Sequence, residues 1–118
     1  MENNVQFLNR ITLRGYVGAV NVNPNVPFIR LQIVTNFGHK YSNEGAVIET
    51  TWLPAVFFPP KDKLDRYRKI KKGDAVKVIG RLRNFKKILE NGQEINEVEV
   101  YASSLQKLKA NNSLLLQV

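Results

Sequence analysis

Aromatic and basic side chains on predicted strands are the residues of this sequence best suited to chemistry. Trp52 and Phe58 lie six residues apart in one segment of strand character, so they project to the same side of it. Leu53, Ala55 and Phe57 already supply the core face of that segment. We therefore expect Trp52 and Phe58 at a surface or a subunit interface, where aromatic faces are able to stack with bases of a single-stranded nucleic acid.

A second predicted strand and its extension carry cations with an aromatic residue among them. The basic residues are Lys77, Arg81, Arg83, Lys86 and Lys87, and Phe85 is interleaved with them. A cationic groove combined with stacking rings is the arrangement by which proteins hold single strands. We expect these cations to contact phosphates rather than base edges, so binding should not depend on sequence.

Catalytic and metal-binding patterns are weak in this chain. His39, the single histidine, sits in a polar loop predicted at 36–45, without a Cys or a carboxylate at ligand spacing. The sequence has no Gly-rich phosphate loop, no nucleophile elbow and no HExxH motif. Its acidic residues Glu90, Glu94, Glu97 and Glu99 are expected to form a patch on a solvent face and to pair with the basic strand beside it. We predict a binding protein that is not an enzyme and has no cofactor or metal.

Composition limits the class of protein and of partner. The 118 residues are enough for one domain, and 43% of them are hydrophobic, so a core without disulfides is feasible. Eighteen Lys and Arg against ten Asp and Glu give a net charge of +8, which favours a polyanionic partner. Cysteine is absent, which excludes disulfides and thiol catalysis. No apolar run approaches a membrane span and the N-terminus does not resemble a signal peptide, so we expect a cytoplasmic protein without membrane contact.

Strand patterns dominate the chain. Strands are predicted at about 10–21, 28–35, 49–58, 75–85 and 94–105, with one helix at 61–72. Three strands, a helix and two strands are the order of an OB-fold, an all-β five-stranded Greek-key barrel with a helix between strands three and four. Asn91-Gly92 is a hairpin signal between the last two strands. The predicted domain is 1–109, followed by a short tail at 110–118.

Several side-chain placements follow from these patterns. In the first strand, Ile11, Leu13, Gly15, Val17 and Ala19 share one face, and Gly15 and Gly18 indicate a bulge or a sharp bend. In the third strand, Val56 is expected to face outward with Trp52 and Phe58. The predicted helix holds seven Lys and Arg and two Asp, and Gly73 is expected to cap it. We favour a solvated face over a DNA contact for this charge run, with both alternatives open.

Six segments resemble, in order and with near-correct spacing, motifs of the bacterial single-stranded DNA-binding proteins (SSB). They are Asn9–Gly18, Val34–Asn36, Thr50–Trp52, Val56–Phe58, Lys72–Arg83, and Gly92–Gln93 with Glu97–Val98. The resemblance implies an OB-fold, a homotetramer or dimer, and single-stranded DNA (ssDNA) wrapped over outer aromatic and basic residues. Trp52 and Phe58 fall on stacking positions of that family, whereas His39 and Lys87 occupy two others that do not match. The predicted DNA contacts are Trp52, Phe58, Arg30, His39, Lys40, Lys77, Arg81, Arg83, Phe85, Lys86 and Lys87.

The end of the sequence departs from that family. SSB proteins carry a flexible tail with an acidic tip, whereas no Asp or Glu follows Glu99 here. Either the tail is missing from this sequence or the protein is a tailless variant of the family. In both cases the resemblance implies a protein that binds and protects ssDNA in replication, repair or recombination, and we expect no recruitment of partners through an acidic tip. Two alternatives stay open. One is a primosomal accessory OB protein of the PriB type, and the other is a structural OB module that binds an acidic protein.

Overall fold

The computed structural model describes residues 5–41 and 45–109, and only the backbone at 39–41. The predicted order of elements is confirmed. It runs β1 (Ile11–Val22), β2 (Ile29–Tyr41), β3 (Gly45–Phe57), a 3₁₀ turn η1 (Lys61–Lys63), α1 (Leu64–Tyr67), β4 (Ala75–Ile88) and β5 (Glu94–Lys107). The predicted tail at 110–118 lies outside the described residues.

The five strands close into one barrel in the order β1-β2-β3-β5-β4. β1 pairs antiparallel with β2 on one side and with β4 on the other, which closes the sheet. The remaining junction is parallel and short, because only Ala55–Phe57 of β3 pair with Val100–Ala102 of β5. This topology confirms the OB-fold prediction and brings β5, the last strand, beside β3.

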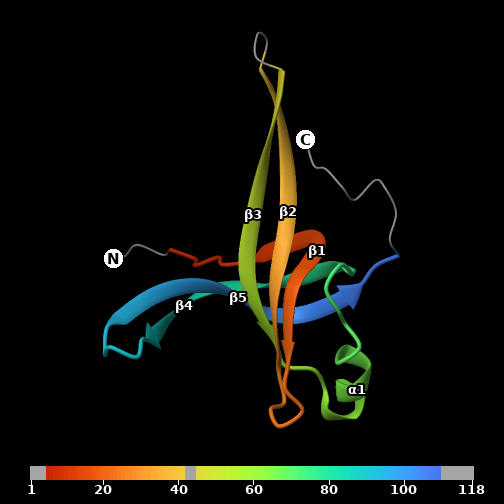
Figure 1. Ribbon diagram of the computed structural model, residues 1–118, viewed down its shortest axis with the longest axis vertical. Coiled ribbons are helices and arrows are strands. Elements are labelled where there is room, and N and C mark those ends of the chain that lie inside the picture. Colours follow the sequence, from red (N-terminus) through yellow and green to blue (C-terminus); the bar gives the residue numbers. More distant parts are fainter. Residues whose placement is uncertain (1–4, 42–44, 110–118) are drawn as a thin grey trace.

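Two hairpin arms extend from the barrel (Figure 1). The β2–β3 arm continues in register to the pair Tyr41 and Gly45, so the polar loop expected at 36–45 is wrong for most of its length. A long antiparallel ladder satisfies the backbone polar groups of this arm where side-chain patterning alone indicated a loop. The predicted loop residue His39 accordingly lies in β2, opposite Val47 of β3.

The β4–β5 arm ends in the predicted hairpin turn. Its ladder extends to the pair Ile88 and Glu94. Gly92 adopts a φ of 85°, and the backbone N–H of Gln93 donates to Oδ1 of Asn91 at 3.0 Å. A residue with positive φ beside an Asn side chain that accepts a local hydrogen bond is what makes Asn-Gly a turn signal.

The core fills the barrel from all five strands. Its buried members include Val17, Ile29, Leu31, Ile33, Ala55, Phe57, Val76, Val78, Val100, Ala102 and Leu105. Ile70 and Tyr67, which follow and end α1, pack against it from the connection between β3 and β4. The rings of Tyr67 and Phe57 meet edge-to-face with centroids 5.0 Å apart. The short helix and the turn after it therefore cover part of the barrel core.

A bulge in β1 changes which residues face the core. The register with β2 shifts between Val17 and Ala19, so Gly18 is the extra residue. The bend predicted from Gly18 is confirmed, but the inward placement of Ala19 is wrong. Ala19 is exposed, and Val20 packs against the core in its place. A single inserted residue reverses the alternation of every residue beyond it.

The helix is much shorter than the predicted 61–72. After Tyr67 the chain tightens into turns in which the N–H groups of Lys69 and Ile70 donate to the carbonyls of Arg66 and Tyr67. This turn directs Ile70 into the core. Gly73 then adopts a φ of 94°, and its N–H donates to the carbonyl of Val17 at 2.8 Å. The helix ends early because Gly73 is hydrogen-bonded to β1 and because Ile70 is buried in the core.

Candidate nucleic-acid interface

The outer face of β3 carries Trp52, and Phe58, the second aromatic residue that the sequence singled out, directly follows this strand. Trp52 and Phe58 are 57% and 45% exposed, so both lie at the surface as expected. At about 3.3 Å per residue, six residues of strand place them roughly 20 Å apart. Between them the outward prediction for Val56 fails, because this residue is only 1% exposed. Val56 points away from the barrel core, but neighbouring strands and their side chains cover it.

The position of Trp52 depends on Gly18 of β1. Trp52 pairs with Val34 of β2 in the sheet register. A Cβ placed on Gly18 would overlap Cζ3 of the indole and would lie 2.6 Å from Cγ2 of Val34. The indole therefore reaches across β2 and rests on the β1 backbone, with more than half of its surface open to solvent.

Phe58 belongs to a cluster of three rings at the junction of β2, β3 and β5. Its ring centroid lies 5.3 Å from that of Phe28 and 5.8 Å from that of Tyr101. Phe28 precedes β2, and Tyr101 pairs with Val56 across the parallel β3–β5 junction. These distances are typical of interacting aromatic pairs. Barrel closure thus joins three aromatic residues that are distant in the sequence.

Three arginines lie over the rings of this cluster. The guanidinium carbon of Arg30 is 5.4 Å from the Phe28 ring centroid. Those of Arg81 and Arg83 are 5.1 Å and 4.3 Å from the Tyr101 ring centroid. All three distances lie within cation–π range. We call these six residues, Phe28, Arg30, Phe58, Arg81, Arg83 and Tyr101, the arginine–aromatic cluster.

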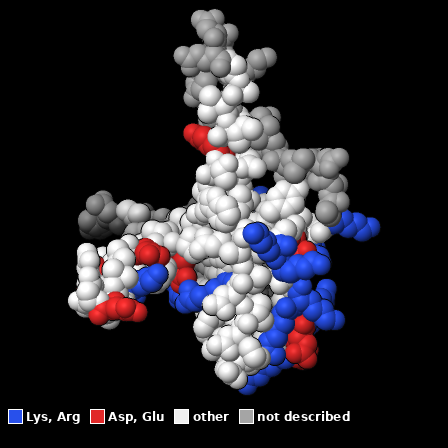
Figure 2. All heavy atoms as spheres, viewed as in Figure 1, with Lys and Arg blue, Asp and Glu red and all other residues white. Residues whose placement is uncertain are grey.

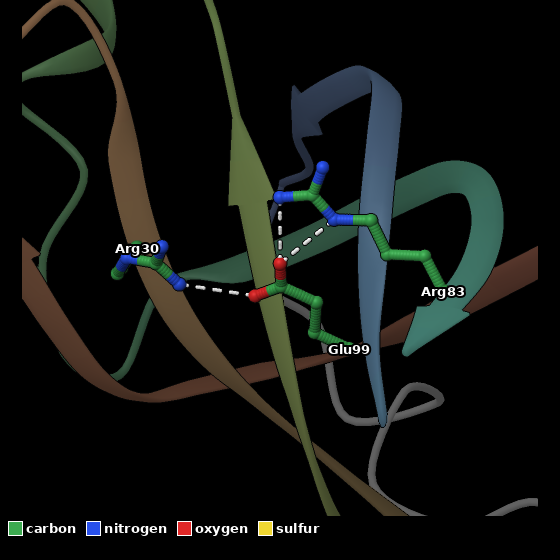
Figure 3. A network of polar contacts seen from close by, with 3 residues as sticks. All are labelled: Arg30, Arg83 and Glu99. Atoms are coloured by element: carbon green, nitrogen blue, oxygen red, sulfur yellow. Dashed lines mark hydrogen bonds and ion pairs between the residues drawn. The ribbon is translucent and has the colours of Figure 1, made fainter. Parts of the chain in front are cut away.

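Glu99 joins two of these arginines beneath the surface (Figure 3). Nη1 of Arg30 donates to Oε2 of Glu99 at 3.0 Å, while Nε of Arg83 donates to Oε1 at 2.9 Å and Nη2 of Arg83 lies 2.8 Å from Oε1. Glu99 is only 1% exposed. The expectation that it belongs to an acidic solvent face is wrong, because closure of the barrel places an arginine on each side of its carboxylate.

A groove beside this cluster collects four of the predicted contact residues. Arg30, Phe85, Lys86 and Lys87 line it together with Pro54, Glu97 of β5 and other residues of β1, β2, β3 and β4, and its volume is about 640 Å³. Pro54 lies between Trp52 and Val56 on the outer side of β3. The groove therefore lies between the exposed indole and the arginine–aromatic cluster, and Arg30 belongs to both the groove and the cluster.

Of the remaining predicted contacts, only Lys77 is placed by the described side chains, and it lies away from this surface. Lys77 pairs with Arg14 of β1 and Gln106 of β5, at the end of β4 away from the arm. His39 and Lys40 lie in β2 opposite Val47 and Ala46, and their side chains are outside the described part of the structure. Within the groove, Lys86 forms an exposed ion pair with Glu94, with a distance of 3.7 Å.

Basic residues also gather around α1 (Figure 2). They flank a second cavity of about 490 Å³ lined in part by Arg66, Lys69 and Lys107. Arg68 pairs with Asp65 at 3.4 Å, and Lys107 pairs with the largely buried Asp74 at 3.5 Å. Among the residues that the structure describes, Tyr67, which is half-buried, is the one aromatic residue that lines this cavity. It offers charge without an exposed stacking ring.

Sequence reasoning missed Phe28, Tyr101, Glu99 and Gly18 as parts of the candidate interface. Alternation placed Phe28, Tyr101 and Glu99 on outward faces, which was the available signal. Their meeting depends on the β3–β5 junction, which no local pattern specifies. Among the described residues, no group of three or more His, Cys, Asp and Glu side chains is arranged to hold a metal ion. No helix in the described ranges is long and apolar enough to cross a membrane.

Comparison with known proteins gives matches at the level of structure. No protein-family model matches the sequence, and no curated protein matches it. The chain is similar to the SSB of Plasmodium falciparum solved in complex with ssDNA, with a TM-score of 0.70 and 25% identity over 91% of this chain and 100% of that one. It also shares the fold of a small single-stranded DNA-binding protein from Streptomyces coelicolor, with a TM-score of 0.60 and 19% identity over 83% of this chain and 92% of that one.

These neighbours confirm the resemblance to single-stranded DNA-binding proteins that the sequence motifs indicated. The likeness spans the whole barrel rather than one motif, because it covers nine-tenths of the chain in the first comparison. The protein has an OB-fold, and its barrel is similar in structure to those of single-stranded DNA-binding proteins.

Proposed function

We propose that this protein binds ssDNA without sequence preference and protects it during replication, repair or recombination. The observation that carries the proposal is a groove lined by Arg30, Phe85, Lys86 and Lys87, which shares Arg30 with the arginine–aromatic cluster and lies on the barrel that also exposes Trp52. Exposed rings interleaved with cations are the arrangement that binds single strands by stacking and by phosphate contacts. Such a surface binds rather than catalyses, so we propose no enzymatic activity.

The residues of this surface divide into two roles. Trp52 and Phe58 stack on bases, because each presents about half of its surface to solvent. Arg81, Arg83, Lys86 and Lys87 contact phosphates, and Arg30 and Phe85 line the path between the two ring sites. Stacking on a ring face accepts any base and phosphate contacts carry no sequence information, so the preference for sequence is weak.

Fluorescence of the single tryptophan tests the proposal directly. Titration with oligo-dT should quench Trp52 emission, and Trp52→Ala should weaken binding by about 1–3 kcal/mol, the value of one base–aromatic stack. Phe7→Ala, which removes a ring that is 95% exposed and belongs to neither the groove nor the arginine–aromatic cluster, is the matched control and should leave the affinity unchanged. Unchanged emission at saturating dT, or equal losses in both variants, would contradict stacking by Trp52.

The two alternative functions give different results in binding assays. A structural OB module for an acidic protein would bind a poly-glutamate peptide at least as tightly as dT. A primosomal accessory protein of the PriB type would bind dT and would also capture a replicative helicase-loading complex in a pull-down. We propose a homotetramer or dimer that wraps ssDNA, and the mass in solution with and without poly-dT tests this assembly.

A further inference from the structure

The carboxylate of Glu99 is an unexpected group to find beneath a surface proposed to hold a polyanion. It is almost completely buried, whereas the Arg30 and Arg83 side chains that contact it keep 47% and 33% of their surface exposed. The negative charge therefore lies below the surface and the two positive charges lie at it. One carboxylate against two guanidinium groups leaves a net charge of +1 in the network.

Each arginine is held at two points. Arg83 directs both Nε and Nη2 to one oxygen of Glu99, and its guanidinium also lies over the Tyr101 ring. Arg30 uses only Nη1 for the carboxylate and lies over Phe28. The N–H groups of Nη1 of Arg83 and of Nε and Nη2 of Arg30 are not used by Glu99. A planar guanidinium with a fixed orientation and unused donors is suited to bind a phosphate with two hydrogen bonds.

We propose that Glu99 is a positioning residue that strengthens the binding of ssDNA, although its own charge repels phosphate. This inference rests on the proposed function. The carboxylate holds Arg30 and Arg83 in one arrangement before DNA arrives, so binding does not have to immobilise two long side chains. Without it, the two guanidinium groups would repel each other and regain their rotational freedom.

The inference predicts the opposite sign from simple charge counting. Glu99→Gln preserves the size of the side chain and removes one negative charge, so electrostatics alone would tighten binding to DNA. We expect weaker binding to oligo-dT instead, by about tenfold at low salt, because charge-assisted hydrogen bonds order both arginines. We also expect the salt dependence of log K to fall by roughly 0.7 for each phosphate contact that is lost.

Glu97→Gln is the matched control. Glu97 lies two residues earlier on β5, and no ion pair involving it occurs among the described residues. It has the same charge to lose but no arginine to position, so Glu97→Gln should bind dT slightly more tightly. Quenching of Trp52 at saturating dT should be the same in both variants and in the unmodified protein, because the stacking site is unchanged. A thermal melt of each variant checks that binding is measured at a temperature below its unfolding transition.

Arg83→Lys provides a second test that does not depend on tolerance of Glu99→Gln. Lysine keeps the positive charge but cannot offer two N–H groups in one plane to Oε1, nor stack as a plane on Tyr101. The inference predicts weaker dT binding and a smaller salt slope for this variant as well. If Glu99→Gln binds as tightly as Glu97→Gln, or if Arg83→Lys binds like the unmodified protein, the positioning role is overturned. Failure of the unmodified protein to bind dT would instead overturn the proposed function, and this inference with it.

Discussion

Gly18 and Trp52 are in direct contact across the barrel surface, although one lies in β1 and the other in β3. A Cβ at position 18 would lie 2.8 Å from Cη2 of the indole. The residue that forms the bulge in β1, Gly18, is therefore also the residue against which the Trp52 indole packs. This contact holds the indole in place while 57% of Trp52 stays open to solvent, where a base is able to stack on it.

Gly18→Ala should displace the Trp52 indole from its seat. The added methyl group meets side-chain atoms of Trp52 and Val34, which are able to rotate, so we expect a modest loss of about 1–3 kcal/mol in the free energy of unfolding. The emission maximum of Trp52 should shift, and the affinity for dT should fall as it does in Trp52→Ala. Thr12→Ala, on an exposed part of the same strand, is the control. An unchanged emission spectrum in Gly18→Ala would show that the contact does not orient the ring.

Gly80→Ala should be more damaging to the fold than Gly18→Ala. A Cβ at position 80 would overlap the carbonyl oxygen of Tyr101 and would lie 2.8 Å from Cα of Ala102. These are backbone atoms of β5 next to its bulge, and they cannot rotate away. We expect a loss of about 3 kcal/mol or more in chemical denaturation. Equal stability of the two alanine variants would mean that the β4–β5 bulge adapts more easily than its geometry indicates.

Phe58→Ala should weaken dT binding by about 1–3 kcal/mol and also loosen the ring cluster that it shares with Phe28 and Tyr101. The control is Val98→Ala, since Val98 has a comparable exposure of 46% on β5 but no ring. Titrations should be made well below the melting temperature of each variant. If both substitutions weaken binding equally, the loss reflects general loosening of the barrel rather than a stack.

Neutralisation of Arg81 distinguishes a phosphate contact at the interface from a general effect of positive charge on DNA binding. Arg81→Gln should lower the slope of log K against log salt by roughly 0.7, with the same loss for dT and for mixed-sequence oligonucleotides. Lys72→Gln removes the same charge from the exposed segment that follows α1 and should change the slope much less. Equal slopes in the two variants would assign the cations around α1 to DNA binding and reject the interpretation of that segment as a solvated face.

Local patterns in the sequence determined the order of the elements, the strand-rich barrel and the exposure of Trp52 and Phe58. Alternation, turn residues and glycines report on neighbours within a few positions, so the Asn91-Gly92 turn and the Gly18 bend were predictable. The same reasoning placed Ala19 inward and made a loop of 36–45. The first error arose because a bulge reverses the alternation, and the second because a polar segment becomes a strand when it has a partner strand to pair with.

Only the tertiary structure determined the burial and the contacts of Glu99, Val56 and Tyr101. All three lie on the side of their strands that faces away from the core, which in isolation indicates solvent. Closure of the barrel brings β5 beside β3 and places Arg30 of β2 and Arg83 of β4 on either side of Glu99. The contact between Arg30 and Glu99, 69 positions apart, depends on the register of β2, β3 and β5, and no local property of the sequence encodes that register. The sequence therefore indicated which residues had the chemistry, and the closed barrel determined which of them met.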